Sequence, residues 1–434
     1  MNKIARPWSK GEKAIVVSVV TILIGATAVA AWMNSVDAVP VVNVPTPTMP
    51  APNGFDYLVV ACRTASEGWP MRWTSPPGAT APVKDPDLSD PKVLAAADAL
   101  IRQNNSALSA VRHSFSLPYL SPPIRSFTQT MPYMAKFRSV ARLTAFQAEV
   151  DARHGDYHGA ATSSLVAIEM GGRIPQGGDL IHSLVGQACE AIGRKPLWAD
   201  IGKLDATDCR LVAKTIDNVD AHRVTYVECL TQEKWAGESG LQEILRSPNW
   251  KMQLRGLSNG ANNAPQQLQN TIRNSMIGKR QVMADYIAHM DAAIAAAKGP
   301  YGTKAAATPT DLITDVVFVD DDLARFRLTF GETEDKLLMT ACALRAYQLD
   351  HHGQYPSTLS QLVPAYISKV PLDPFAASSP LVYRRTCAVY ALYSVGPDMK
   401  DDKGVAVYDP SQTAARAHTV DVMSKGDIVA GLNL

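Results

Sequence analysis

Close to the N-terminus, residues 14–32 form a run of 19 residues without a charged side chain, AIVVSVVTILIGATAVAAW. As an α-helix, this run is long enough to cross the roughly 30 Å of hydrocarbon in a bilayer. Four Lys and Arg residues precede it, and none follows before Arg63. Because positive charge is retained on the cytoplasmic side, this asymmetry predicts a transmembrane anchor (residues 14–32) with a basic cytoplasmic tail (residues 1–13).

The same run has a second interpretation, a signal peptide that is removed after export. Ala28, Val29 and Ala30 form the A-x-A pattern of a cleavage site. The run is longer than the core of about 7–15 residues that is usual for a signal peptide, so we favour a retained signal-anchor. Both interpretations export the bulk of the chain. We expect a single-pass protein of the inner (cytoplasmic) membrane, with its N-terminus inside, its bulk periplasmic or extracellular, and the membrane and envelope proteins as partners.

The segment after the anchor, residues 33–54, is rich in proline. Five prolines fall between residues 40 and 52. A proline-rich segment is extended and semi-rigid, which suits a stalk that holds a domain away from the bilayer. A disordered linker without a spacing role is the alternative interpretation.

Residues 55–310 are predicted to form a mainly α-helical domain. Its first part, residues 55–91, is interpreted as a loop with at most one strand, because it is rich in tryptophan and proline. The string ARHGDYHGAA around Gly155 resembles the turn of a tetratricopeptide-type helical hairpin, but it occurs once, so it supports a hairpin and no repeat array. Apolar residues at helical spacing, with their caps, predict helices at residues 91–113, 135–153, 158–170, 180–192, 206–219, 222–245 and 266–298.

Residues 311–434 are predicted to form a smaller module of helix and antiparallel sheet. Three acidic residues, 320–322, lie just before an apolar stripe, where they suit the positive end of a helix dipole. A helix is then expected at residues 334–350, a short second helix at 357–366, and strands at 381–384 and 388–395. The turn after the second strand is Gly396-Pro397-Asp398.

Within this module the strings LRAYQLDHHGQYP, VPLDPF, YALYSVGPD and GDIV follow one another in order. This order resembles the periplasmic part of type II secretion major pseudopilins, over roughly the last quarter of the chain. The resemblance implies a long helix, a small antiparallel sheet and a calcium-binding loop. The chain lacks the prepilin cleavage site of that family before residues 14–32. The resemblance therefore implies a membrane-anchored protein that has borrowed the domain, rather than a pilus subunit.

The acidic loop of this module supplies the candidate metal ligands Asp398, Asp401 and Asp402. Calcium prefers several oxygen ligands, and three carboxylates with backbone carbonyls suffice to hold it. The alternative is a solvated acidic turn, because acidic turns are common. The resemblance gives the ion site the same weight as the solvated turn, and of the three residues only Asp398 matches the family's G-x-D position. Calcium is the one cofactor that we expect.

No other pattern in the chain points to chemistry. No metalloprotease, P-loop, nucleophile-elbow or dinucleotide motif occurs. The adjacent His351 and His352 suit a helix C-terminus better than a metal site. The six cysteines contain no CxxC pair, and we interpret them as buried apolar residues, with a Cys342–Cys387 disulfide as an alternative outside the cytoplasm. The formal net charge of +1 gives no attraction to nucleic acid, and we expect none as a partner.

The sequence therefore predicts an α+β, mostly α protein. It combines an N-terminal transmembrane helix, a large α-helical domain and a small C-terminal pseudopilin-like module. The expected function is that of a non-catalytic, membrane-anchored extracytoplasmic scaffold or assembly protein linked to a secretion or pilus-type system. The alternative is an envelope hydrolase with its active site in the helical domain, which would require a deep pocket with perturbed carboxylates or histidines.

Overall fold

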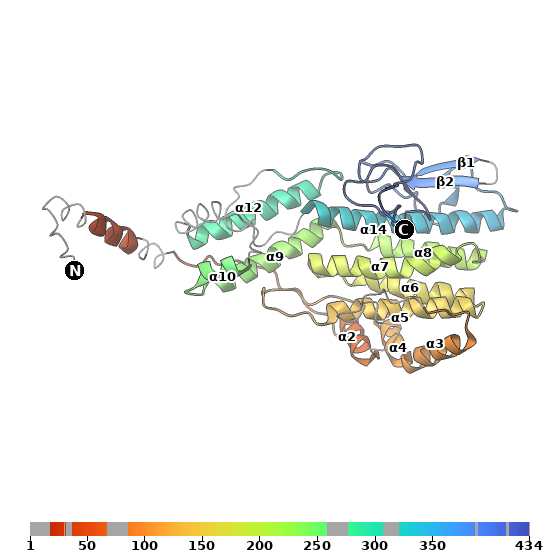
Figure 1. The fold of residues 1–434 in the computed structure, drawn as a ribbon, viewed down its shortest axis with the longest axis horizontal. Helices are drawn as coiled ribbons and strands as arrows, with labels where there is room; N and C mark the ends of the chain where they lie inside the picture. Colours follow the sequence, from red (N-terminus) through yellow and green to blue (C-terminus); the bar gives the residue numbers. More distant parts are fainter. Residues whose placement is uncertain are drawn as a thin grey trace, which may run out of the picture. The chain divides into compact units, whose positions relative to one another are not determined.

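A computed structural model describes residues 18–29, 31, 37–66, 86–257, 277–306, 321–386, 389–413 and 416–433. Over these residues the protein is mostly helical, with a small three-stranded antiparallel sheet near the C-terminus (Figure 1). The prediction of an α+β, mostly α fold is thus confirmed.

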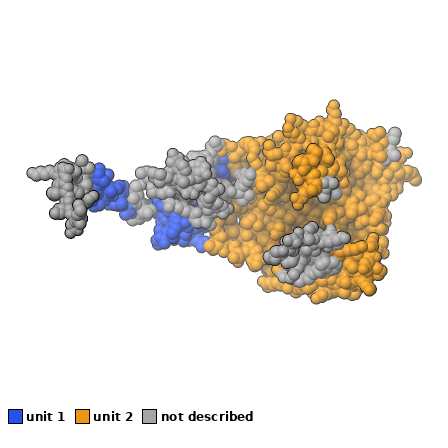
Figure 2. All heavy atoms as spheres, viewed as in Figure 1, with its two compact units in different colours: residues 1–44, 237–292, 307–318 blue, residues 45–236, 293–306, 319–434 orange. Residues whose placement is uncertain are grey.

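Contacts divide the chain into two compact units, shown in Figure 2. Unit 1 holds residues 1–44, 237–292 and 307–318, and unit 2 holds residues 45–236, 293–306 and 319–434. The predicted helical domain and the predicted C-terminal module therefore share unit 2 for most of their length.

Unit 1 contains α10 (Trp250–Leu257) and most of α12 (Lys279–Ala297). Residues 37–50, in the segment after the predicted anchor, are neither helix nor strand, and two hydrogen bonds join residues 37 and 40 to other parts of this unit. The carboxylate of Asp37 accepts from the backbone N–H of Lys279, and the Gln242 amide donates to the Pro40 carbonyl at 2.9 Å. The predicted helix at 266–298 begins at Lys279 among the described residues, and residues 258–276 lie outside them.

Residues 18–29 of the predicted anchor are helical, and the rest of that segment, apart from residue 31, lies outside the described residues. In the part of the chain that the structure describes, no helix combines the length and the apolar character needed to cross a membrane.

Unit 2 contains a helical hairpin, as the sequence predicts. Helix α5 (Tyr133–Arg153) and helix α6 (Tyr157–Arg173) pack against each other across the turn at Gly155. Gly155 has φ +80°, a left-handed conformation that glycine adopts without steric cost. Asp156 then caps α6, because its carboxylate accepts from the backbone N–H of Gly159 at 2.8 Å.

The next helices are α7 (Leu180–Asp200), α8 (Ala206–Ala221) and α9 (Tyr226–Leu245). The caps Asp179 and Asp205 fix the starts of α7 and α8, since each carboxylate accepts two backbone N–H groups. Helix α7 is longer than predicted and continues through Pro196.

The first part of unit 2 differs from the prediction in two places. Residues predicted as loop form helix α2 (Gly54–Thr64), whose N-cap Asn53 accepts from the backbone N–H of Phe55 at 3.1 Å. The single helix predicted at residues 91–113 is divided into α3 (Pro91–Gln103) and α4 (Asn105–Ser114). The divider is Asn104, a buried residue whose side-chain amide bonds to the hydroxyl of Ser66 at 2.9 Å.

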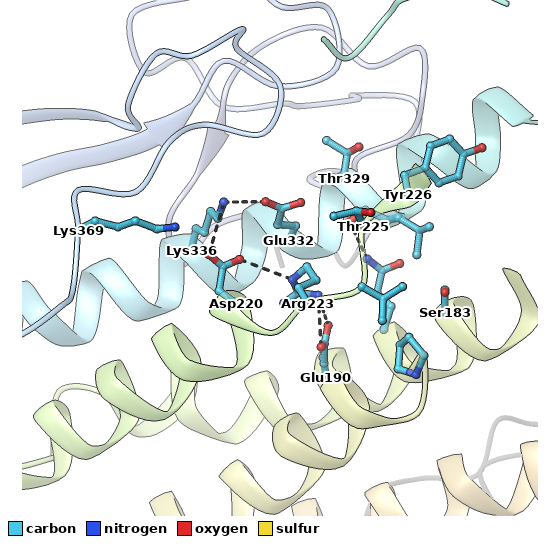
Figure 3. A pocket seen from close by; sticks show the side chains of 14 residues that line it. Ser183, Glu190, Asp220, Arg223, Thr225, Tyr226, Thr329, Glu332, Lys336 and Lys369 are labelled. Carbon is cyan, nitrogen blue, oxygen red and sulfur yellow. Dashed lines mark hydrogen bonds and ion pairs between the residues drawn. The ribbon is translucent and has the colours of Figure 1, made fainter. Parts of the chain in front are cut away.

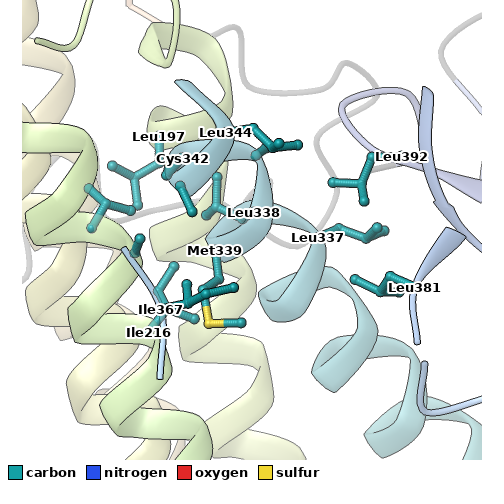
Figure 4. Close-up of a cluster of buried hydrophobic side chains, with 14 of the residues drawn as sticks. Leu197, Ile216, Leu337, Leu338, Met339, Cys342, Leu344, Ile367, Leu381 and Leu392 are labelled. Atoms are coloured by element: carbon teal, nitrogen blue, oxygen red, sulfur yellow. The ribbon is translucent and has the colours of Figure 1, made fainter. Parts of the chain in front are cut away.

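Helix α14 (Asp321–Asp350) is the element that joins the module to the helical layers. The sequence predicts two separate segments here, and the structure has one continuous helix. One face of α14 carries Leu337 toward Leu381 and Leu392 of the sheet side (Figure 4). Other buried residues of α14 pack on α7 and α8, and the two sets belong to one hydrophobic cluster. The module and the helices of unit 2 therefore have a common core.

The sheet has the order β1-β2-β3, from β1 (Val382–Thr386), β2 (Val389–Ser394) and β3 (Ile428–Val429). Both pairs are antiparallel, with Val382 opposite Tyr393 and Tyr393 opposite Val429. The hairpin at 387–388 lies outside the described residues. The short helix expected at 357–366 is a 3-10 turn, η1 (Leu359–Leu362).

Asp373 of the Asp-Pro-Phe turn fixes this sheet to the preceding loop. Its carboxylate is buried and accepts from Phe375 N at 3.0 Å, Ser394 Oγ at 2.7 Å and Val395 N at 2.9 Å. The turn after β2 requires glycine at position 396, because φ is +71° and a Cβ would lie 2.7 Å from the Gly426 carbonyl oxygen.

Candidate functional site

A cavity of about 340 Å³ lies in unit 2 between α7, the end of α8, the start of α9 and α14 (Figure 3). Ionisable side chains from separate segments line it: Glu190, Asp220, Arg223, Glu332, Lys336 and Lys369. Its volume is at the lower end of the range of about 300–1,000 Å³ that is usual for ligand sites.

Helical spacing brings the polar residues of each wall onto one face. On α7, Ser183, Gln187 and Glu190 are four and three residues apart, so they project from the same side of the helix. On α14, Glu332 and Lys336 are four residues apart and bond to each other at 2.6 Å.

Arg223 connects three elements across the cavity wall. It lies just after α8, and its guanidinium donates to Glu190 of α7 at 3.1 Å and to Asp335 of α14 at 2.5 Å. Its Nε is 3.6 Å from the carboxylate of Asp220, at the end of α8. One side chain thus links α7, α8 and α14 through ion pairs.

Behind the wall, Asp335 is fully buried and receives a second guanidinium. Arg194 of α7 donates to its other carboxylate oxygen at 2.6 Å. Lys336 completes the network, because its ammonium is 3.7 Å from Asp220 as well as close to Glu332. Glu334, the buried neighbour of Asp335 on α14, interacts electrostatically with Arg194. We call the whole set the charged cluster, and it comprises Glu190, Arg194, Asp220, Arg223, Glu332, Glu334, Asp335 and Lys336.

Burial controls the protonation of the carboxyls in the charged cluster. It raises the pKa of Glu190 to about 8, although Arg223 and Arg194 act in the opposite direction. It likewise raises the pKa of Glu334 to about 8 and that of Asp220 by a smaller amount. For Asp335, burial also raises the pKa, but the guanidiniums of Arg194 and Arg223 together outweigh it, so the pKa is below its ordinary value.

The raised pKa values of Glu190 and Glu334 bring the charge of the cluster closer to balance. Three cations (Arg194, Arg223 and Lys336) face five carboxyl groups. With Glu190 and Glu334 protonated, three carboxylates remain, which equals the number of cations. Buried charges are tolerated when they are paired in this way. The arrangement can therefore hold helices together, and its two protonated acids can also donate protons.

The structure places the predicted metal ligands in the loop after β2, with different partners. The Asp401 carboxylate accepts from Tyr393 Oη at 3.0 Å and Lys403 N at 2.8 Å, and it pairs with Arg384 at 3.1 Å. Asp398 accepts from the backbone N–H of Lys400 at 3.2 Å. The backbone N–H of Asp402 donates to the buried Asp427, which also accepts from Gly404 at 2.6 Å.

Among the residues that the structure describes, no group of three or more His, Cys, Asp or Glu side chains is arranged to hold a metal ion. Calcium binding by Asp398, Asp401 and Asp402 stays a prediction.

Three histidines near helix ends have separate local partners. His351 stacks on Tyr347 with ring centroids 3.7 Å apart, at the end of α14. His154 and His158 pair with different carboxylates, Asp98 at 3.0 Å and Asp208 at 2.6 Å.

The remaining minor predictions fall partly outside the described residues. Asp322, just before the apolar stripe of α14, pairs with Lys304. Asp320 is not among the described residues. Cys342 carries a free, buried thiol, and its candidate disulfide partner Cys387 also lies outside the described residues.

Sequence reasoning missed the charged cluster, including Glu190, Arg223 and Asp335. A signal exists in retrospect, since Arg194 is followed by Leu197 at helical spacing and Asp335 by Leu338 and Met339. A charge in such a pattern indicates a buried partner on another element. The sequence does not say which element supplies that partner.

Comparisons of this chain with known protein families, with curated proteins and with solved structures find no significant match.

Proposed function

We propose that the protein is a non-catalytic, membrane-anchored extracytoplasmic scaffold that carries a pseudopilin-like module and acts in assembly at the cell envelope. The observation that carries this proposal is the common core of unit 2. Because α14 packs on the sheet with one face and on α7 and α8 with the others, the module is held as part of a rigid platform. A rigid platform that presents a loop-rich module suits the docking of other proteins.

Two further features support a scaffold. The charged residues of the cavity are largely paired with one another, as expected of groups that fix helices in place. The uncharged run at residues 14–32, with basic residues before it, supplies the anchor in this proposal.

The test uses the full chain with an affinity tag at its C-terminus, expressed in a Gram-negative host. We expect the protein in the inner-membrane fraction, and we expect protease added to spheroplasts to degrade the tag. A variant without residues 14–32 serves as the control and should leave the membrane fraction. Crosslinking followed by affinity capture should recover envelope proteins with the full chain. Recovery in the cytosolic fraction, or protection of the tag in spheroplasts, would contradict the proposal.

The envelope hydrolase remains a second candidate because of one specific observation. The cavity is lined by Glu190 and Asp220, two carboxyls whose pKa burial raises, and a protonated acid in a cavity can serve as a general acid. This candidate predicts hydrolysis of a glycoside, ester or peptide substrate by the purified protein. It also predicts that Glu190→Gln abolishes that activity while Glu243→Gln, a change on α9 away from the cavity lining, preserves it. Equal activity of both variants would exclude Glu190 as the acid.

A further inference from the structure

Among the Asp, Glu, Lys and Arg residues of the described cavity lining, Lys369 is the one that does not belong to the charged cluster. It follows Ser368, whose backbone N–H and hydroxyl bond to the Asp217 carboxylate of α8 at 2.7 and 2.9 Å. The chain is therefore fixed to α8 immediately before Lys369. Figure 3 shows the Lys369 side chain extending toward Lys336.

Lys369 has no acidic partner among the residues that the structure describes. The carboxyls that line the same cavity are each engaged elsewhere. Glu190 pairs with Arg223, Glu332 pairs with Lys336, and Asp220 lies near both of those cations. The carboxyls around the Lys369 ammonium thus already have partners. An anion that enters the cavity would therefore be attracted to this ammonium.

A second donor in the lining is also unsatisfied. The Nε atom of Arg223 is buried and, within the described part of the chain, has no hydrogen-bond acceptor. The 3.6 Å separation from Asp220 is an ion pair that exceeds hydrogen-bond distance. A buried N–H without an acceptor is destabilising, and a bound oxygen ligand would relieve part of that cost.

The charge of the cavity lining also favours the binding of an anion. The cavity is lined by three cations, Arg223, Lys336 and Lys369, and by three carboxyls, Glu190, Asp220 and Glu332. Burial raises the pKa of Glu190 and that of Asp220, which shifts the charge of the lining toward positive. The hydroxyl-bearing residue Thr329 lies in the same lining.

We propose that this cavity binds a small oxyanion, a carboxylate or a phosphate group, through Lys369 and Arg223. The ligand joins the loop of the C-terminal module to the helical layers, because Lys369 comes from the first and Arg223 from the second. Charge-assisted hydrogen bonds of this kind are roughly twice as strong as neutral ones. The inference does not depend on the proposed scaffold function, since it concerns a small-molecule site inside unit 2.

The experiment uses the purified full chain in a mild detergent at pH 7. Thermal unfolding and calorimetric titration are carried out with sodium phosphate, sodium succinate and sodium chloride at matched ionic strength. We expect a saturable rise in Tm with phosphate or succinate and none with chloride. The oxyanion that binds more tightly identifies the ligand as a phosphate or a carboxylate compound.

Two lysine variants make the test specific. Lys369→Ala removes an exposed side chain without a partner, so the fold should be retained, and oxyanion affinity should fall about tenfold or more. Lys400→Ala, an exposed lysine of the acidic loop, is the matched control and should bind like the unmodified protein. Absence of saturable binding of either oxyanion, or equal affinity of the two variants, would overturn the proposal.

Discussion

Asp335→Asn is the substitution that tests the charged cluster most directly. Asp335 is fully buried in α14, and its two carboxylate oxygens accept from different guanidiniums, Oδ1 from Arg194 and Oδ2 from Arg223. Asparagine has nearly the same shape but only one oxygen. Its NH₂ group must therefore face one of the two guanidiniums, and the negative charge between them is lost.

The size of the effect follows from what each arginine retains. Arg223 keeps its hydrogen bond to Glu190 and its ion pair with Asp220, whereas Arg194, among the described residues, keeps a long hydrogen bond of 3.5 Å to the Gly331 carbonyl. Removing one partner of a buried ion pair costs about 3–5 kcal/mol, because the other charge remains buried without compensation. In Asp335→Asn it is mainly Arg194 that stays buried without compensation. We therefore expect the free energy of unfolding to fall by about 3 kcal/mol.

The assay is urea unfolding of the full chain in a mild detergent, followed by far-UV circular dichroism. Asp421→Asn is the matched control, because Asp421 is an exposed carboxylate in the same unit. The free energy of unfolding of Asp421→Asn should lie within about 0.5 kcal/mol of that of the unmodified protein. If Asp335→Asn costs no more than Asp421→Asn, the buried carboxylate does not hold the two arginines, and our account of the cluster is wrong.

Three further predictions concern pH, helix packing and calcium. The pKa of Glu334 rises to about 8 in the folded protein, so between pH 4.5 and 8 the folded state keeps a proton that the unfolded chain releases, and stability falls as pH rises. Glu334→Gln should therefore stabilise the protein by more than about 1 kcal/mol at pH 8 and by little at pH 5; an equal effect at both values would refute the shift. Gly186→Ala should lower the free energy of unfolding in urea by about 1–3 kcal/mol, because the alanine Cβ would lie 2.5 Å from the Gly171 carbonyl oxygen. Gly202→Ala is the control and should be near neutral, because the space around Gly202 is open. The predicted calcium loop requires that calcium raises Tm relative to EDTA and that Asp401→Asn removes this rise; equal Tm values with calcium and EDTA would eliminate the site.

The parts of the fold that the sequence predicts well are those with local causes. The α5–α6 hairpin follows from two adjacent residues. Gly155 forms the turn, and Asp156 caps α6. The strands at 382–386 and 389–394 follow from apolar and aromatic residues between turn residues. In each case the chain segment itself contains the interaction that stabilises its conformation.

The errors arise where the stabilising partner is distant in the sequence. Helix α2 was predicted as loop, but its cap Asn53 also donates to the Leu120 carbonyl at 2.8 Å, and the Gly54 N–H donates to the Pro118 carbonyl at 2.8 Å. The break between α3 and α4 depends on Asn104, whose partner Ser66 is 38 residues away. No window of the sequence contains both halves of these contacts, so tertiary interactions override the local pattern.

The charged cluster depends most strongly on partners that are distant in the sequence. It also explains why the helical layers and the module form one unit. Glu190 and Arg194 are four residues apart on α7 and present opposite charges on one face, an arrangement that would ordinarily indicate an exposed pair. Neither bonds to the other, because Asp335 and Arg223 attract them separately. The pairing is set by which groups are buried together, and burial is a property of the assembled layers. The helix that brings Asp335 to this place is the same α14 that supports the sheet, so the ion pairs and the shared hydrophobic core fix the same arrangement of elements.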